Sequence, residues 1–180
     1  LTPTTYYTKE SGAGLAIALA NEREEKTQDS VSVGLIGLGI GTLAAYCNED
    51  DTYIFYEINP ANEAVAREYF SFLDSCKGYL KVKTGDGRVL LEQELRNKEP
   101  GNYDVLVLDA FSDDAIPVHL LTTEAFETYL SHLRTNKSLI ALHTSNTFID
   151  LIPMISSIAE KHGLTMIVSR ASRIVPSTRI

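Results

Sequence analysis

The sequence is poor in cysteine. Cys47 and Cys76 are its two cysteines among 180 residues. Neither lies in a C-x-x-C motif nor at a spacing from histidine that is typical of zinc ligands. We therefore expect no disulfide framework and no metal site, and a reducing compartment such as the cytoplasm is the default.

Basic residues are also scarce, since 16 Lys and Arg stand against 24 Asp and Glu, which gives a formal net charge of −8. This charge disfavours non-specific electrostatic binding to nucleic acid or to an anionic membrane, so neither is expected as a partner. A cationic or neutral small substrate fits better. Long apolar runs are absent too, because four glycines interrupt the most apolar stretch, residues 31–46. No membrane-spanning segment is expected in this chain.

The length and the 44% share of apolar residues are those of one globular domain, and we place no boundary within residues 1–180. The chain begins at Leu1 and not at a methionine. We therefore expect it to be a fragment of a longer protein.

Short apolar runs alternate with helical patterns along the chain, which predicts a doubly wound, mostly parallel α/β sheet of the Rossmann-like type. Asn59 and Pro60 mark the start of one helix, and Gly163 marks the end of another. The expected helices cover residues 14–25, 60–73, 88–96, 123–133 and 151–161. The expected strands cover residues 31–36, 53–57, 79–84, 104–109, 138–143 and 164–169.

Three alternating glycines, Gly37, Gly39 and Gly41, stand where the first strand ends and a helix is expected to begin. Glycine lets a ligand approach the backbone, and a helix N-terminus offers free N–H groups, so the loop is predicted to bind a nucleotide. The dinucleotide fingerprint requires a third glycine at position 42, where Thr42 stands instead. The alternative is a glycine turn that only packs closely against the sheet.

Acidic residues end the next two strands. Glu57 follows Gly37 by 20 residues, the spacing at which a carboxylate meets a ribose diol, and its alternative is a solvated strand end. Asp86 closes the third strand, where its carboxylate could accept from the exocyclic amine of adenine. An Asx turn or a helix cap explains Asp86 equally well.

Asp109 ends the fourth strand, and the ligands of open α/β sheets bind beyond such carboxyl ends. It is our catalytic candidate, and Asp113 and Asp114 are candidates for binding a cationic substrate, because together these acids could orient or deprotonate an amine. A divalent-metal loop or a solvated turn is the alternative. His143 ends the fifth strand and is either a substrate-binding residue or a structural one. The other histidines are expected at the surface or at helix ends.

Four segments resemble successive motifs of one superfamily: 37–41 (GLGIG), 57–60 (EINP), 85–88 (GDGR) and 103–109 (YDVLVLD). They resemble the spermidine synthase-like branch of the class I S-adenosylmethionine-dependent methyltransferases over about residues 31–146. The run DAFSDDAIPVHLLT that begins at Asp109 is similar to members of that branch that are sometimes fused to membrane transporters.

The resemblance implies that Glu57 holds the ribose, Asp86 meets the adenine and Asp109 assists an attacking amine. It also implies that the ligand is S-adenosylmethionine or its decarboxylated form. Spermidine synthases carry an aspartate inside the glycine loop, whereas this chain has Ile40. Since Ile40 does not repel a carboxylate, we expect both forms of the ligand to bind.

We therefore expect a transferase that moves an alkyl group, such as aminopropyl, to a small-molecule amine acceptor. One alternative is an S-adenosylmethionine-dependent methyltransferase, and another is a non-catalytic nucleoside-binding domain of a transporter-fused protein. The sequence leaves a homodimer open. The C-terminal strand of the superfamily is not recognisable before residue 180.

Overall fold

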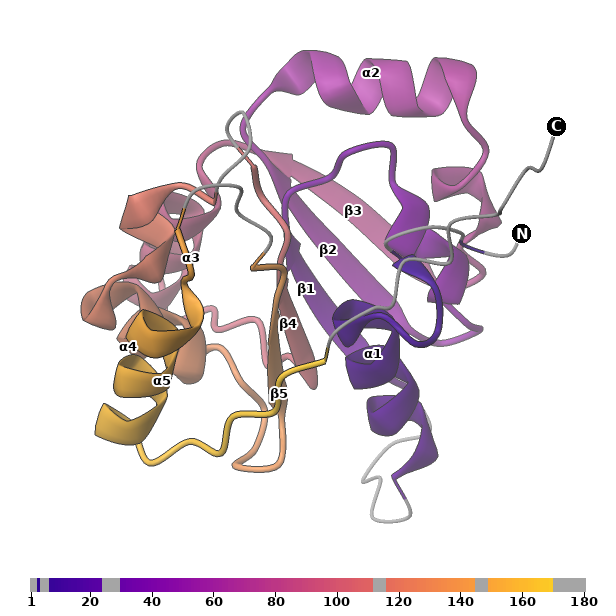
Figure 1. Cartoon of the computed structure of the whole chain (residues 1–180). Coiled ribbons are helices and arrows are strands. Elements are labelled where there is room, and N and C mark those ends of the chain that lie inside the picture. The colour runs from indigo at the N-terminus through magenta and orange to yellow at the C-terminus, as the bar shows by residue number, and fades with distance from the viewer. Residues whose placement is uncertain (1–2, 4–6, 24–29, 112–115, 145–148, 170–180) are drawn as a thin grey trace, which may run out of the picture.

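A computed structural model describes residues 3, 7–23, 30–111, 116–144 and 149–169. Its centre is a sheet of five parallel strands in the order β3-β2-β1-β4-β5 (Figure 1). The strands are β1 (Ser32–Ile36), β2 (Thr52–Glu57), β3 (Tyr79–Thr84), β4 (Val105–Leu108) and β5 (Leu139–Leu142). The helices are α1 (Gly12–Glu22), α2 (Pro60–Tyr69), α3 (Gly87–Arg96), α4 (Thr123–Ser131) and α5 (Ile152–Lys161).

The strand order creates a switch point between β1 and β4. From β1 the chain moves outward through β2 to β3, then crosses back to β4 on the other side of β1. The connections after β1 and β4 therefore leave the sheet in opposite directions and open a crevice at the carboxyl ends of these two strands. The glycine loop and Asp109 both lie at this crevice.

Helices cover both faces of the sheet (Figure 1). Ile17 of α1 belongs to one core, which includes Leu35 and Val107 of the central strands. The opposite core contains Leu106 and Leu108 of β4, together with side chains of α3, α4 and α5. Because neighbouring residues of β4 point to opposite faces, the strand is buried on both sides and reads as a continuous apolar run.

The predicted doubly wound α/β fold is confirmed, and five of the six expected strands are present. Asn59 caps α2 through a bond from Ala61 N, and Gly163 ends α5 with a φ of 65°. The expected sixth strand is wrong, because residues 164–169 have no regular structure. The alternation of apolar residues in this segment is a local pattern, whereas a strand also needs a neighbouring strand to pair with. Ile167 is 87% exposed, so this side chain does not pack against the sheet.

The helix expected after the glycine loop is short. The chain forms the 3-10 helix η2 (Thr42–Tyr46) there, preceded by Gly41 in the left-handed region. Thr42, Leu43 and Ala44 are buried, so this turn serves mainly to pack the loop against the core. A second 3-10 helix, η3 (Leu73–Ser75), packs beside it.

The expectation about the cysteines is also wrong, because Cys47 and Cys76 form a disulfide. Cys47 ends η2 and Cys76 ends η3. The two are 29 residues apart in sequence, and they meet because the connection between β2 and β3 folds back onto η2. Spacing rules test local motifs, so they could not reveal this pair.

Within the part of the chain that the structure describes, no helix has the length and apolar character needed to cross a membrane.

Candidate functional site

The glycine loop approaches the end of β4 closely. Gly37 N donates to Tyr56 O at 2.8 Å, and Gly37 has a φ of 101°. A Cβ at Gly37 would collide with the backbone carbonyl of Asp109. Glycine is therefore required here both because of the positive φ and because no room is left for a side chain. Gly39, with a φ of 54°, faces open space where a ligand could lie against the backbone.

A cavity of about 330 Å³ lies against this loop. Its walls come from the glycine loop, Phe55, Phe72, Tyr7 and Asp109, and we call it the loop cavity. Among the described residues that line it, Asp109 is the one that carries a charge. The volume is within the range of small-molecule sites. As far as the described residues form it, the wall of the loop cavity is thus mainly apolar and carries the carboxylate of Asp109.

Glu57 lies directly behind the glycine loop. Its carboxylate accepts a hydrogen bond from Leu38 N at 3.0 Å and another from Asn59 N at 2.8 Å. Glu57 is buried, with 5% of its surface exposed. The alternative interpretation, a solvated carboxylate at a strand end, is therefore wrong. An ionised carboxylate has about four acceptor positions, which leaves further ones for ligand hydroxyls. Glu57 therefore holds the glycine loop in place and can still accept further hydrogen bonds.

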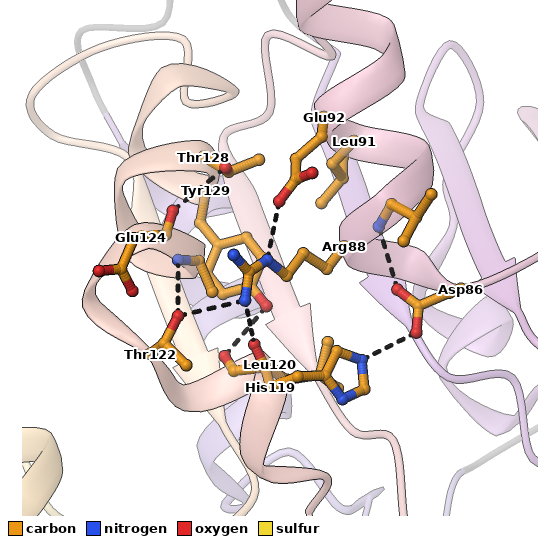
Figure 2. A network of polar contacts seen from close by, with 12 residues as sticks. Asp86, Arg88, Leu91, Glu92, His119, Leu120, Thr122, Glu124, Thr128 and Tyr129 are labelled. Atoms are coloured by element: carbon orange, nitrogen blue, oxygen red, sulfur yellow. Dashed lines mark hydrogen bonds and ion pairs between the residues drawn. The ribbon is translucent and has the colours of Figure 1, made fainter.

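Asp86 caps α3, as one of the two sequence-based interpretations proposed. Its Oδ1 accepts from Val89 N at 3.0 Å, and its Oδ2 lies 2.8 Å from His119 Nε2. Figure 2 shows this carboxylate between the first turn of α3 and the His119 ring. The carboxylate is thus held in place at the carboxyl edge of the sheet.

Arg88 anchors the segment that carries His119. Its Nη1 donates to His119 O at 2.7 Å and to Thr122 Oγ1 at 3.2 Å, while its Nε pairs with Glu92 at 2.8 Å (Figure 2). Thr122 in turn caps α4 by accepting from Ala125 N. The segment after the acidic cluster is therefore fastened to α3 beside Asp86. Sequence reasoning assigned no role to Arg88 or His119.

Asp109 lies beside His143, because β4 and β5 are parallel neighbours and each residue follows the end of its strand. His143 Nδ1 is 2.7 Å from Asp109 Oδ1. The ring of Phe111 packs edge-on against His143, with centroids 4.7 Å apart. The structure thus brings the histidine candidate into contact with the catalytic candidate Asp109, which lines the loop cavity. Asp113 and Asp114 lie outside the described residues.

Tyr7 is the site residue that the sequence analysis missed. It lines the loop cavity, and its phenol is within hydrogen-bonding reach of Asp109. Burial, followed by the charge of Asp109 and their hydrogen bond, raises the pKa of Tyr7 well above its ordinary value of 10. The phenol is therefore neutral near pH 7. No local sequence signal identifies Tyr7, because Asp109, which follows β4, is distant from it in sequence.

The structure divides the predicted site residues into two adjoining groups. Gly37, Gly39 and Asp109 line the loop cavity, whereas Glu57 and Asp86 do not. Glu57 is joined to the cavity wall through its bond to Leu38 N. Among the described residues, no group of three or more His, Cys, Asp or Glu could hold a metal ion.

Sequence comparison finds two relatives with transferase activities. The chain is 32% identical over 118 residues to a polyamine aminopropyltransferase of Vibrio vulnificus, which covers 63% of this chain and 36% of the relative. It is 32% identical over 111 residues to an N-terminal histidine N-methyltransferase of Emericella nidulans, which covers 61% and 19%. The chain thus spans about a third and a fifth of these relatives. No family model matches it.

Solved structures share its fold. Human methyltransferase-like protein 13 in complex with SAH matches 83% of this chain and 69% of its own, with a TM-score of 0.62 and 21% identity. Spermidine synthase from Thermotoga maritima matches 74% and 44%, with a TM-score of 0.54 and 18% identity. The resemblance to the spermidine synthase-like branch of the class I methyltransferase superfamily is confirmed.

The class I relationship fits the predicted chemistry at two points. The relatives and structural neighbours are an aminopropyltransferase, methyltransferases and a spermidine synthase, as expected for a transferase. The human neighbour holds SAH, which is an S-adenosyl nucleoside, the class of ligand that the family resemblance implies.

Proposed function

We propose that this chain binds an S-adenosyl nucleoside and transfers an alkyl group from its sulfur to an amine acceptor. The single observation that carries the proposal is the contact between Glu57 and Leu38 N, which joins a buried carboxylate to the glycine loop. In this arrangement the ribose lies on Glu57, the adenine reaches Asp86, and the sulfur end points into the loop cavity. The open space beside Gly39 supports this placement.

Asp109 is proposed to act on the acceptor. In the transfer, the amine lone pair forms a new bond to carbon, the carbon–sulfur bond breaks, and its electrons return to sulfur as a neutral thioether. The amine must lose one proton, and a carboxylate within reach can accept it. Asp109 is the one charged residue among the described residues of the cavity wall, which supports a protonated or neutral amine as the acceptor. His143 is proposed to hold this carboxylate and to contact the acceptor.

The first choice for the transferred group is aminopropyl, as in a spermidine synthase-like enzyme. The relationship to the Vibrio vulnificus protein supports it. Methyl transfer from S-adenosylmethionine is the second candidate. It is favoured by Ile40, which places an uncharged side chain on the cavity wall.

A thermal-shift experiment tests the nucleoside proposal directly. Methylthioadenosine, S-adenosylmethionine and decarboxylated S-adenosylmethionine are each added to the purified chain. A ligand that binds the folded state raises its stability by RT ln(1 + [L]/Kd), so all three should raise the melting temperature. We expect the two sulfonium forms to differ in affinity by less than about 100-fold, or roughly 2.7 kcal/mol.

The outcomes separate the candidate functions. If none of the three nucleosides raises the melting temperature, the proposal is wrong. If they bind and an amine acceptor is then modified, the mass that the acceptor gains distinguishes methyl from aminopropyl. Binding without transfer to any amine would favour the non-catalytic nucleoside-binding alternative.

A further inference from the structure

The backbone of His119 is anchored to two helices. It lies in the 3-10 helix η4 (Val118–Leu121), in which Leu120 is buried. From α3, Arg88 Nη1 donates to His119 O at 2.7 Å, and from α4, Tyr129 Oη donates to Leu120 O at 3.0 Å (Figure 2). The position from which the His119 side chain projects is therefore fixed.

The ring of His119 completes the contacts of the Asp86 carboxylate. His119 Nε2 lies 2.8 Å from Asp86 Oδ2, while Asp86 Oδ1 accepts from Val89 N at 3.0 Å. An ionised carboxylate only accepts hydrogen bonds, so His119 is the donor in this contact. A carboxylate that is held at both oxygens cannot turn about its last side-chain bond without breaking one of the two contacts. His119 thus fixes the plane of the carboxylate as well as its position.

The contribution of the His119 ring to folding is small. Its side chain is 47% exposed, so it is not part of the core, and polar contacts at such exposed positions add little to stability. The cap on α3 is made by the other carboxylate oxygen and does not need the ring. The ring therefore serves mainly to orient Asp86 at the carboxyl edge of the sheet, where the proposed nucleoside lies.

An oriented carboxylate can distinguish between purine bases. Adenine carries an amino group at C6, which can donate to a carboxylate, whereas hypoxanthine carries a carbonyl oxygen there, which cannot. A site that is built to accept a hydrogen bond rejects a ligand that lacks the donor, because the group of the site is left unpaired. A carboxylate that is free to rotate discriminates less, since it can turn away from the carbonyl oxygen and let water lie between them.

We propose that His119 is a specificity-determining residue of the nucleoside site, which holds Asp86 in the orientation that accepts a 6-amino purine and rejects a 6-oxo purine. His119 acts through Asp86 and is therefore a positioning residue. The inference rests on the proposed function, and it adds to that site a residue that selects the base. It predicts that the loss of His119 changes the choice between bases and not only the affinity.

The test compares the Kd values of methylthioadenosine and 5′-methylthioinosine by calorimetry. The two nucleosides differ in the group at C6 and in the hydrogen that the 6-oxo base carries on N1. We expect the parent to prefer methylthioadenosine by at least about 50-fold. His119→Leu removes the donor and should reduce this preference to below about 10-fold, whereas His119→Gln keeps an N–H donor and should retain most of it. Val118→Ala is the matched control on η4, because Val118 is 80% exposed, and it should keep the preference of the parent.

The readouts separate the possible failures. If His119→Leu weakens the binding of both nucleosides equally, the residue has a structural role, and the inference is wrong. It is also wrong if His119→Gln loses the preference as fully as His119→Leu, because the hydrogen bond to Asp86 is then not the cause. A parent that binds the two nucleosides equally would show that Asp86 does not select the base. A parent that binds neither nucleoside would instead overturn the proposed function on which the inference rests.

Discussion

His143 Nδ1 lies 2.7 Å from Asp109 Oδ1 at the carboxyl edge of the sheet. The pairing of Leu108 with Leu142 in the β4–β5 register places the residues that follow them side by side. His143 N also donates to Leu108 O at 3.0 Å, which extends the ladder by one residue. The carboxylate that we assign to the acceptor is thus positioned by the sheet itself and not by a long loop.

Replacement of Glu57 by alanine should weaken nucleoside binding. The loss of hydrogen bonds to a charged group costs roughly 1.5 to 3 kcal/mol, which corresponds to about 10- to 150-fold in affinity. Isothermal calorimetry with methylthioadenosine measures the change. Glu63→Ala is the control, because Glu63 pairs with Arg67 on the exposed side of α2, and its loss should leave the Kd unaltered. Unchanged affinity in Glu57→Ala would remove the ribose from this position.

His132 should make the stability of the fold depend on pH. It lies at the end of α4, one of the two places expected for it, and it is fully buried. Its Nδ1 accepts from Gly101 N, while Nε2 is bonded to Leu91 O. Burial lowers the pKa of His132, so the unfolded chain binds a proton more readily than the folded one. This histidine therefore costs no stability above the unfolded pKa of about 6.5, and stability is lost as the pH falls below it.

Chemical unfolding at about pH 7.5 and pH 5.5 checks this effect. Between these conditions the parent should lose more free energy of unfolding than His132→Gln, by up to about 1.4 kcal/mol. Glutamine offers an acceptor for Gly101 N and a donor for Leu91 O, and it does not titrate. An equal loss in both proteins would show that His132 does not cause the pH dependence.

Removal of the disulfide should destabilise the chain. Cys47 and Cys76 close a loop of 29 residues, and the entropy of such a loop corresponds to about 3 to 4 kcal/mol of unfolding free energy. The double variant Cys47→Ser/Cys76→Ser and the parent are compared by denaturant unfolding with and without dithiothreitol. The reductant should lower the stability of the parent towards that of the variant and leave the variant unchanged. A parent that is indifferent to dithiothreitol would contradict the role of this bond.

The features that the sequence predicted correctly depend on local patterns. Short runs rich in apolar residues marked β1 to β5, and Asn59 marked the start of α2. The residues at strand ends indicated Asp109 and His143 as neighbours at one edge of the sheet. Each of these signals lies within a short stretch of sequence. The carboxyl ends of parallel strands meet at one edge of the sheet, so once the strands are assigned, the residues that follow them are expected to lie close together.

The features that the sequence did not reveal depend on contacts between distant segments. The disulfide needs the β2–β3 connection to return to η2. Tyr7 and Asp109 line the same cavity, although they come from distant parts of the sequence. Asp86 illustrates an intermediate case, because its cap on α3 was one of two interpretations, whereas its pairing with His119 depends on how residues 116–122 fold back. A strand pattern over residues 164–169 was misleading because no sheet edge among the described residues receives it.

The most direct test of the account is the Asp109→Asn variant, which keeps the shape of the side chain and removes its charge. One preparation each of parent and variant is titrated with methylthioadenosine and assayed for transfer to an amine acceptor. If Asp109 acts on the acceptor as proposed, the Kd should stay within about threefold of the parent, or roughly 0.7 kcal/mol, while transfer falls at least about 100-fold. Equal turnover in parent and variant would contradict the central claim that Asp109 acts on the acceptor.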